Sequence, residues 1–270
     1  MCKVLEVSRS GYYSYLKSRK KTNGVELVEL MALVKEIHRE SKGAYGSRRM
    51  SRGLRERGYD IGRYRARTLM KMAGVSVKSK KRYKVTTDSR HGYPVAPNIL
   101  NRQFDVAAPD RVWVSDITYL WTKEGWMYLA VVMDLYSRKI VGWSIDKRMT
   151  QELAKNALIM ASGRRKPGDG LIHHSDRGSQ YAAYAYQDLL VEHSMICSMS
   201  RKGDCWDNAV IESFFGTLKR ERVHLMRYET RMEAKKDIVD YIEMFYNCRR
   251  LHSYLGYVSP NQFEKGAILT

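Results

Sequence analysis

The chain has 270 residues, 44% of them hydrophobic, and a formal net charge of +19. This length and apolar content predict one substantial core plus a smaller module, and they exclude a disordered chain. The longest strongly apolar stretch, Trp126 to Met133, is too short to cross a bilayer, and no apolar signal segment follows the N-terminus. The scattered cysteines contain no CxxC pair, so we expect a cytoplasmic protein without a disulfide framework, a zinc knuckle or membrane contact.

Basic charge is concentrated at one end of the chain. Residues 1–100 carry a net charge of +16, whereas residues 101–270 carry only +3. A basic end of this kind predicts a polyanionic partner, and the pI of 9.8 favours nucleic acid. The alternative interpretation is a solvated basic surface that aids solubility.

After an N-terminal junction segment, residues 1–23, the basic region at 24–77 has helical periodicity. Apolar residues from Leu27 to Ile37 predict one helix, and Ser47 is positioned to cap a second helix that stops at Gly58. A third helix ends at Gly74 and carries a basic stripe of Arg63, Arg67 and Lys71. The pattern predicts a small all-α, helix-turn-helix-like module whose basic stripe contacts DNA, with an ordinary helical bundle as the alternative.

Residues 78–104 contain a basic run, a glycine and two prolines, and they predict a linker. The domain that follows, 105–265, changes to strand periodicity at 111–120, 126–133 and 140–145. Thr150 is positioned to cap a helix that runs to about Ser162, and a further short strand begins at Leu171. A three-stranded meander, a helix and a returning strand indicate a mixed α/β domain.

Three acidic residues of this domain occupy unusual positions. Asp116 lies within a predicted strand, where an unpaired carboxylate is costly, and Asp176 follows the short strand at 171. Glu212 lies on a helix that Asp207 or Asn208 can cap. Three carboxylates on two strands and a helix could together hold two hard divalent cations, because oxygen ligands suit magnesium. Each acid taken alone could equally be salt-bridged or solvent-facing.

The spacing and the flanking motifs carry a family resemblance. Asp116 and Asp176 are separated by 59 residues, and Asp176 and Glu212 by 35. This spacing resembles the D,D(35)E signature of retroviral-integrase-like transposases. The segments "WVSDITYL", "HSDRGSQY", "DNAVIESFFGTLKRE" and "YNCRRLHSYLGYVSPNQF", in this order, resemble the OrfB transposases of the IS-three family of bacterial insertion sequences. The similarity also covers "YGSRRMSRGL" and "LMKMAGV", and thus nearly the whole chain.

The resemblance implies a ribonuclease-H-like integrase catalytic core with Asp116, Asp176 and Glu212 as the catalytic, metal-binding triad. It implies two Mg²⁺ ions, with Mn²⁺ as a substitute, and a DNA transposase that cleaves at insertion-sequence ends and transfers the DNA strand. Lys219 resembles a position that contacts transposon-end DNA. The implied partners are double-stranded DNA at terminal inverted repeats and at the target, the upstream-frame product OrfA or a fusion with it, and further copies of the chain on DNA. The expected location is the bacterial nucleoid.

Two other functions remain open at this stage, a nuclease on the same fold and a DNA-binding regulator made from the separate second frame. No zipper heptads are present, so this polypeptide is expected to be the catalytic portion, with dimerisation supplied elsewhere.

The other side chains that could belong to a site are expected to have structural roles. His174 is expected to hydrogen-bond its loop, Asp134 to cap a turn, and Trp206, Phe214 and Phe215 to lie in the core, while DNA contact by Arg249, Arg250 and His252 is left open.

Overall fold

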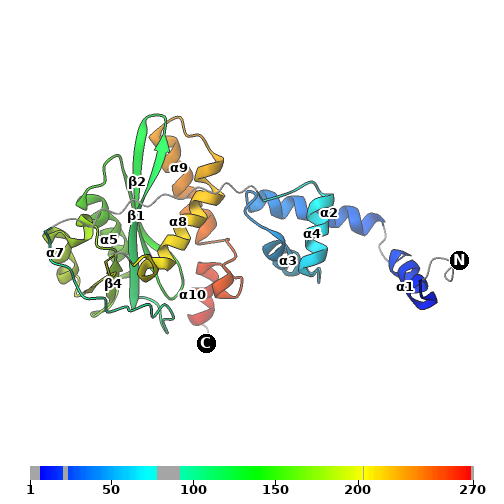
Figure 1. Cartoon of the computed structure of the whole chain (residues 1–270), viewed down its shortest axis with the longest axis horizontal. Coiled ribbons are helices and arrows are strands. Elements are labelled where there is room, and N and C mark those ends of the chain that lie inside the picture. The colour runs from blue at the N-terminus through cyan, green and yellow to red at the C-terminus, as the bar shows by residue number, and fades with distance from the viewer. Residues whose placement is uncertain (1–6, 21–23, 78–91, 203, 269–270) are drawn as a thin grey trace. The chain divides into compact units, whose positions relative to one another are not determined.

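A computed structural model describes residues 7–20, 24–77, 92–202 and 204–268. The chain forms two compact units, Met1–Lys78 and Ser79–Thr270 (Figure 1). The basic run at 78–82 of the predicted linker, and residues 1–6 and 21–23 of the predicted junction segment, lie outside the described residues. Among the described helices, none is long and apolar enough to span a membrane.

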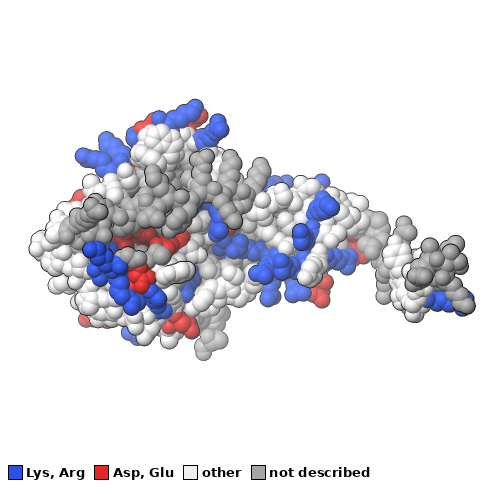
Figure 2. All heavy atoms as spheres, in the orientation of Figure 1, with Lys and Arg blue, Asp and Glu red and all other residues white. Residues whose placement is uncertain are grey.

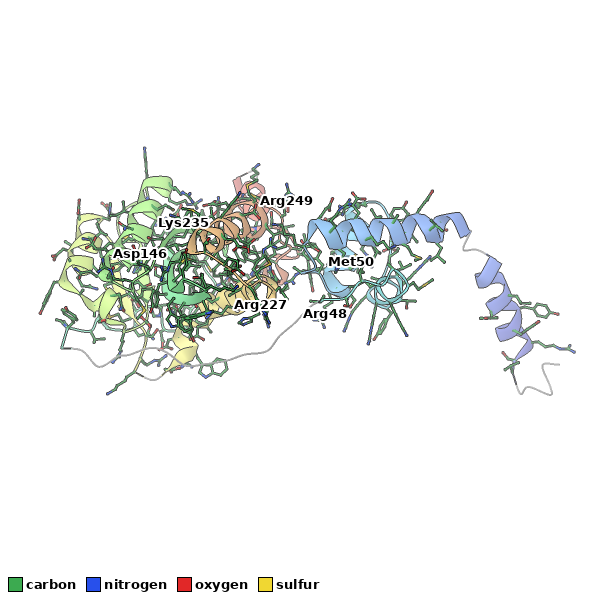
Figure 3. The ribbon with its side chains drawn as sticks, turned by 90° about the horizontal axis from the view of Figure 1, so that it is seen from above. Arg48, Met50, Asp146, Arg227, Lys235 and Arg249 are labelled. Atoms are coloured by element: carbon green, nitrogen blue, oxygen red, sulfur yellow. The ribbon has the colours of Figure 1, made fainter. Side chains whose placement is uncertain are left out.

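The smaller unit is helical, as the sequence predicts. It contains α1 (Arg9–Lys20), α2 (Gly24–Glu40), α3 (Ser47–Glu56) and α4 (Arg63–Met72). The last three helices pack through apolar side chains at helical spacing, and Figure 3 labels Met50, which is fully buried among them. One detail of the prediction is wrong: Ser47 begins α3, and the cap position belongs to Gly46, which has no side chain with which to cap.

The larger unit is built on a five-stranded sheet with the strand order β3-β2-β1-β4-β5. The strands are β1 (Val112–Thr122), β2 (Gly125–Asp134), β3 (Ile140–Asp146), β4 (Ile172–Ser175) and β5 (Ile196–Met199). The first three form the predicted antiparallel meander. The returning strand β4 pairs with β1 in parallel, and β5, which the sequence analysis did not identify, pairs in parallel with β4.

Helices lie on both sides of the sheet (Figure 1). On one side, α5 (Gln151–Arg165), α6 (Ser179–Ala182) and α7 (Tyr184–Glu192) bury a core with Trp113 of β1. Helix α5 approaches so closely that a Cβ on Gly142 would lie 2.2 Å from the Ala157 carbonyl oxygen, so glycine is required there. On the other side lie α8 (Ala209–Glu221), α9 (Arg231–Asp240), a π-helical turn (Tyr241–Tyr246) and α10 (Pro260–Ile268).

Part of the predicted linker, 78–104, is packed against the sheet. The Met199 backbone N–H donates to the Pro97 carbonyl, and the Ser198 hydroxyl accepts from the backbone N–H groups of Ile99 and Leu100. The Leu100 side chain is buried. The segment that reaches β1 therefore belongs to the larger unit well before residue 105.

Two other predictions about turns can be compared with the structure. Asp134 is buried at the end of β2 and accepts hydrogen bonds from the backbone N–H groups of Asp110 and Ser137, so it closes the turn as expected. Thr150 occupies the cap position of α5, but its side chain accepts no capping hydrogen bond.

The C-terminal end of α8 is fixed by a buried ion pair. The Arg250 guanidinium donates to both Glu221 carboxylate oxygens over 2.9 and 2.8 Å, and the Tyr241 hydroxyl donates to the same carboxylate over 2.7 Å. The Arg250 and Glu221 side chains are only 5% and 11% exposed. This settles one open question from the sequence: Arg250 holds the tail against α8, whereas the neighbouring Arg249 is exposed.

The buried pair makes a testable prediction about stability. Arg250→Leu should lower the free energy of unfolding by about 3–5 kcal/mol, because it leaves the Glu221 charge buried without its partner. Lys235→Leu, on the exposed surface of α9, should change it by at most about 0.5 kcal/mol. Urea denaturation of both variants measures the difference. Equal stability of the two variants would contradict a structural role for the Glu221–Arg250 pair.

Candidate active site

The register of β1 against β4 brings two of the three acids together. The parallel pairing ends with Ser115 opposite Ser175, and the next residue on each strand is an aspartate, Asp116 and Asp176. Adjacent strands lie about 4.8 Å apart, and residues in parallel register point to the same face of a sheet. Both acids are half-buried. Two carboxylates that are 59 residues apart in sequence therefore emerge side by side where the two strands separate.

The backbone around the two acids fixes their carboxylates. The backbone N–H of Gly178 donates to Asp176 Oδ1 over 2.9 Å, and that of Ile117 donates to Asp116 Oδ1 over 2.7 Å. A Cβ on Gly178 would lie 3.0 Å from Asp176 Oδ1 and 3.1 Å from Gln180 Oε1. The glycine after Asp176 thus leaves room for the turn that returns a backbone N–H to the carboxylate.

The third acid comes from α8, which packs beside β1. At the helix start, the Asn208 side-chain amide donates to the Ser115 carbonyl over 3.4 Å, next to Asp116. Glu212 stands exposed in the first turn of the helix. Near the other end, Lys219 Nζ lies 4.5 Å from the centroid of the Tyr119 ring on β1. Helix α8 therefore runs along the strand that carries Asp116, with Glu212 and Lys219 on its length.

The three acids repel one another. The pKa of Asp116 is raised well above its usual range by burial, then by the negative charges of Asp176 and Glu212, against the lowering effects of the Ile117 N–H and the Lys219 charge. The pKa of Glu212 is also raised, by burial and by Asp176. Burial lowers the pKa of Lys219, and the charge of Asp116 opposes that shift. A cluster of like charges in a half-buried place is the electrostatic environment that a bound cation relieves.

The donor atoms of this cluster are all carboxylate oxygens, which suit Mg²⁺ and other hard cations. Among the described residues, no group of three or more His, Cys, Asp or Glu side chains lies close enough together to hold a metal ion. The three acids fit a hard cation in donor type and charge. To bind the same ion, their side chains would have to move closer together. Figure 2 shows acidic side chains gathered on the visible face of the larger unit, with basic side chains beside them.

A second ion-pair network holds the N-terminal end of α8. Asp207 is fully buried and accepts hydrogen bonds from the Arg102 and Arg201 guanidinium groups and from the Asn98 side-chain amide. These cations hold the pKa of Asp207 below its usual value, with Arg201 the largest contributor. Asp207 therefore fastens the segments before β1 and after β5 to the start of α8. The cap position itself belongs to Asn208, whose side chain makes no capping hydrogen bond.

Comparisons with known proteins agree with this architecture. Residues 106–205 and 212–267 match the integrase core domain family, and residues 26–83 match the HTH-like domain family. The chain is 40% identical over 266 residues to the transposase InsF of insertion sequence IS3A from Escherichia coli K12, covering 98% of this chain and 92% of InsF. The chain belongs to the IS3-family transposases.

Two other relatives extend the comparison. The transposase is 45% identical over 265 residues to an uncharacterized 31 kDa protein of insertion element IS600 from Shigella sonnei, covering 98% of this chain and 97% of that protein. It is 44% identical over 242 residues to the transposase of IS904 from Lactococcus lactis, covering 89% of this chain and 95% of that protein. A chain of the simian T-cell lymphotropic virus intasome aligns at 14% identity with a TM-score of 0.49, covering 86% of this chain and 74% of that one.

The family match confirms the predicted ribonuclease-H-like integrase core and the helix-turn-helix-like module of the transposase. It also makes the chain a DNA transposase, an enzyme of the polynucleotidyl transferase class. Sequence analysis did not identify Asp207, Arg102 and Arg201 as a network. Asp207 stands directly before the α8 motif, but nothing in the sequence pairs it with arginines 105 and 6 residues away.

The structure corrects one prediction near the site. Phe214 and Phe215 lie in the core as expected, but Trp206 is 68% exposed. It precedes the buried Asp207 in a short 3-10 turn (Cys205–Asn208), where three residues per turn point neighbouring side chains in different directions. His174 is confirmed as a hydrogen-bonding residue, because its Nδ1 and Nε2 contact the hydroxyls of Ser198 and Ser200 over 2.9 and 3.2 Å.

Two histidines behind the acids should make the stability of the transposase sensitive to acid. Burial lowers the pKa of His173 from 6.5 to about 3 and that of His174 to about 4. Both stay neutral in the fold, whereas in the unfolded chain they bind protons below about pH 6.5. Their contribution is therefore complete above that pH and is lost as the pH falls, by at most about 1.4 kcal/mol per pH unit for each histidine.

Urea denaturation between pH 8 and pH 4 tests this dependence. His173→Gln keeps a nitrogen donor near the hydroxyls of Ser115 and Tyr186, which lie 2.7 and 3.0 Å from His173 Nε2. The variant should lose stability less steeply than the wild type as the pH falls, and its slope above pH 7 should be unchanged. An identical acid slope in both proteins would show that His173 is not the titrating group.

Proposed function

We propose that Asp116, Asp176 and Glu212 are the catalytic triad of this transposase and hold two Mg²⁺ ions, with Mn²⁺ as a substitute. The observation that carries the proposal is the parallel register of β1 and β4, which puts Asp116 beside Asp176. Helix α8 supplies Glu212 to the same place, and the raised pKa of Asp116 reflects the mutual repulsion of all three charges. An oxygen-only donor set of this kind selects magnesium over zinc.

The chemistry that follows is in-line displacement at phosphorus. In end cleavage, a water oxygen bonds to the phosphorus, the bond from phosphorus to the 3′-oxygen breaks, and a free 3′-hydroxyl remains. In strand transfer, that 3′-hydroxyl attacks a target phosphodiester, and the leaving 3′-oxygen takes up a proton. The bound ions supply activation of the attacking oxygen and stabilisation of the leaving one. The three carboxylates act only as oxygen ligands, so no covalent protein intermediate forms.

The DNA is held by two basic parts of the chain. Lys219 stands between the Tyr119 ring and the acids, where its charge can receive a phosphate of the insertion-sequence end. In the smaller unit, Arg63, Arg67 and Lys71 are exposed on α4, while Ala66, Leu69 and Met70 of the same helix are buried. Figure 2 shows basic side chains gathered on this unit. In this proposal α4 takes the part of the helix that enters the major groove in helix-turn-helix proteins.

The substrates in this proposal are double-stranded DNA at terminal inverted repeats and at the target, which places the protein at the nucleoid. The chain is expected to act as a homo-oligomer assembled on DNA. The upstream-frame product OrfA, or a fusion with it, is the expected partner for dimerisation.

A strand-transfer assay on labelled duplex insertion-sequence ends tests the triad. With Mg²⁺, Asp116→Asn, Asp176→Asn and Glu212→Gln should each lower joining by roughly a thousandfold or more, because each removes a charge that holds an ion. Glu152→Gln, an exposed carboxylate on α5, is the matched control and should join normally. Joining by Glu212→Gln at the wild-type rate would remove Glu212 from the triad.

The same assay separates the alternatives. Cleavage without joining would indicate a nuclease on this fold. A wild type without activity, together with an active fusion to the upstream frame that still needs Glu212, would identify this chain as a catalytic portion. DNA binding without any activity in either form would indicate a regulator.

DNA binding by α4 makes a separate prediction. Arg63→Ala, Arg67→Ala and Lys71→Ala in the full chain should each weaken binding to duplex DNA, and each lost phosphate contact should reduce the slope of log affinity against log salt by about 1. Lys35→Ala, an exposed lysine on α2, is the matched control. Fluorescence anisotropy across a salt series measures both quantities. Unchanged slopes in all three α4 variants would remove this helix from the interface.

A further inference from the structure

The tip of the β1–β2 hairpin carries three neighbouring aromatic rings, Tyr119, Trp121 and Trp126. Trp121 and Trp126 are cross-strand partners whose ring centroids lie 4.8 Å apart at an interplanar angle of 72°. The Tyr119 ring lies 5.2 Å from that of Trp126 at 80°. We call this group the aromatic platform.

Two of the three rings of the aromatic platform are exposed. Trp121 is 56% exposed and Trp126 45%, whereas Trp113, on the same face of β1, is fully buried in the core. Cross-strand aromatic pairs stabilise a hairpin, and that accounts for the edge-to-face contact between the two indoles. The contact between the two indoles does not explain why much of their ring surface is exposed to water. Neighbouring exposed aromatic rings of this kind are typical of a binding site.

The platform lies near the proposed active site but on the opposite face of β1, because Asp116 is an odd number of residues from Tyr119 and Trp121. Lys219 bridges the two, because its Nζ stands 4.5 Å from the Tyr119 ring centroid and its charge acts on Asp116. Asp116 and Trp121 are five residues apart on β1, about 17 Å along an extended strand. Each nucleotide of a stacked strand advances about 3.4 Å along the helix axis. The platform is therefore within reach of the last few nucleotides of a DNA strand held at the acids.

Cationic side chains surround the platform. Arg231 donates to the Trp126 carbonyl over 3.2 Å. The Lys123 backbone at the hairpin tip donates to the Tyr228 carbonyl, which places the segment between α8 and α9 against the tip. The exposed Arg227 lies in this segment, and Figure 3 labels it there. Glu124 and Glu229 offset part of this charge, because Arg231 donates its backbone N–H to Glu124 and Lys123 pairs with Glu229.

We propose that the aromatic platform stacks unpaired nucleobases at the end of the DNA strand on which the transposase acts. Flat aromatic faces flanked by cations recognise bases of any sequence, since every base has a face on which to stack. Bases inside a duplex are covered by their neighbours, so only a frayed or displaced end can reach the rings. The proposal rests on the proposed function for the position of the strand end at the acids.

The test measures binding without chemistry. A duplex insertion-sequence end with a short unpaired 3′ tail, carrying the fluorescent base 2-aminopurine in that tail, is titrated with the full chain in EDTA. Wild type should quench the probe through stacking. Trp121→Leu keeps apolar packing but removes the ring, and it should weaken tail binding about five- to hundredfold. Trp121→Phe should retain most of the binding, and Ile159→Ala, an exposed apolar residue on α5, should retain all of it.

Two comparisons make the result decisive. Trp121→Leu should bind a blunt, fully paired duplex as the wild type does, and its melting temperature should fall by no more than about 3 °C, the loss expected for one cross-strand aromatic pair. Tail binding by Trp121→Leu as tight as that of the wild type overturns the proposal. An equal loss on tailed and blunt DNA overturns it as well, because the ring would then support the fold and not the bases. Glu212→Gln should quench the probe as the wild type does. Strand transfer therefore tests the triad, quenching tests the aromatic platform, and either proposal can be wrong without the other.

Discussion

The parallel pairing of β1 with β4 places two like charges side by side, and much of the larger unit serves to keep them there. Asp116 and Asp176 follow the last paired residues, Ser115 and Ser175, so neither can move away without breaking the ladder. The cost appears in the raised pKa of Asp116. A fold that holds carboxylates together in this way is prepared for a cation, and the strain on the free site becomes binding energy for the ion.

Helix α8 completes the site because it is held at both ends by ion pairs. Asp207 fixes the helix start through Arg102 and Arg201, and Glu221 fixes its end through Arg250. Between these two points the helix presents Glu212 and Lys219 beside β1. The two networks therefore fix the position of α8 beside β1 as well as stabilising the fold.

The two units differ in the charge of their exposed side chains. The smaller unit exposes cations on a helix whose buried face is apolar, which suits long-range attraction to a DNA backbone. The larger unit keeps its acids at the site and places cations around them. In the proposed function, phosphates repelled by the acids would be drawn in by neighbouring basic groups, and the exposed aromatic rings at the hairpin tip would add an attraction that does not depend on charge.

The sequence by itself determined the elements and the family. Helical spacing gave α2, α3 and α4, apolar runs gave the meander, and the order of the motifs indicated an integrase core that the family matches confirmed. Local pattern carries this information because periodicity depends on neighbouring residues. Tertiary structure alone decided the rest: the adjacency of Asp116 and Asp176, the ion pairs of Asp207 and Glu221, the exposure of Trp206, and the strand β5. These depend on strand register and on partners up to about a hundred residues away, which no local pattern encodes.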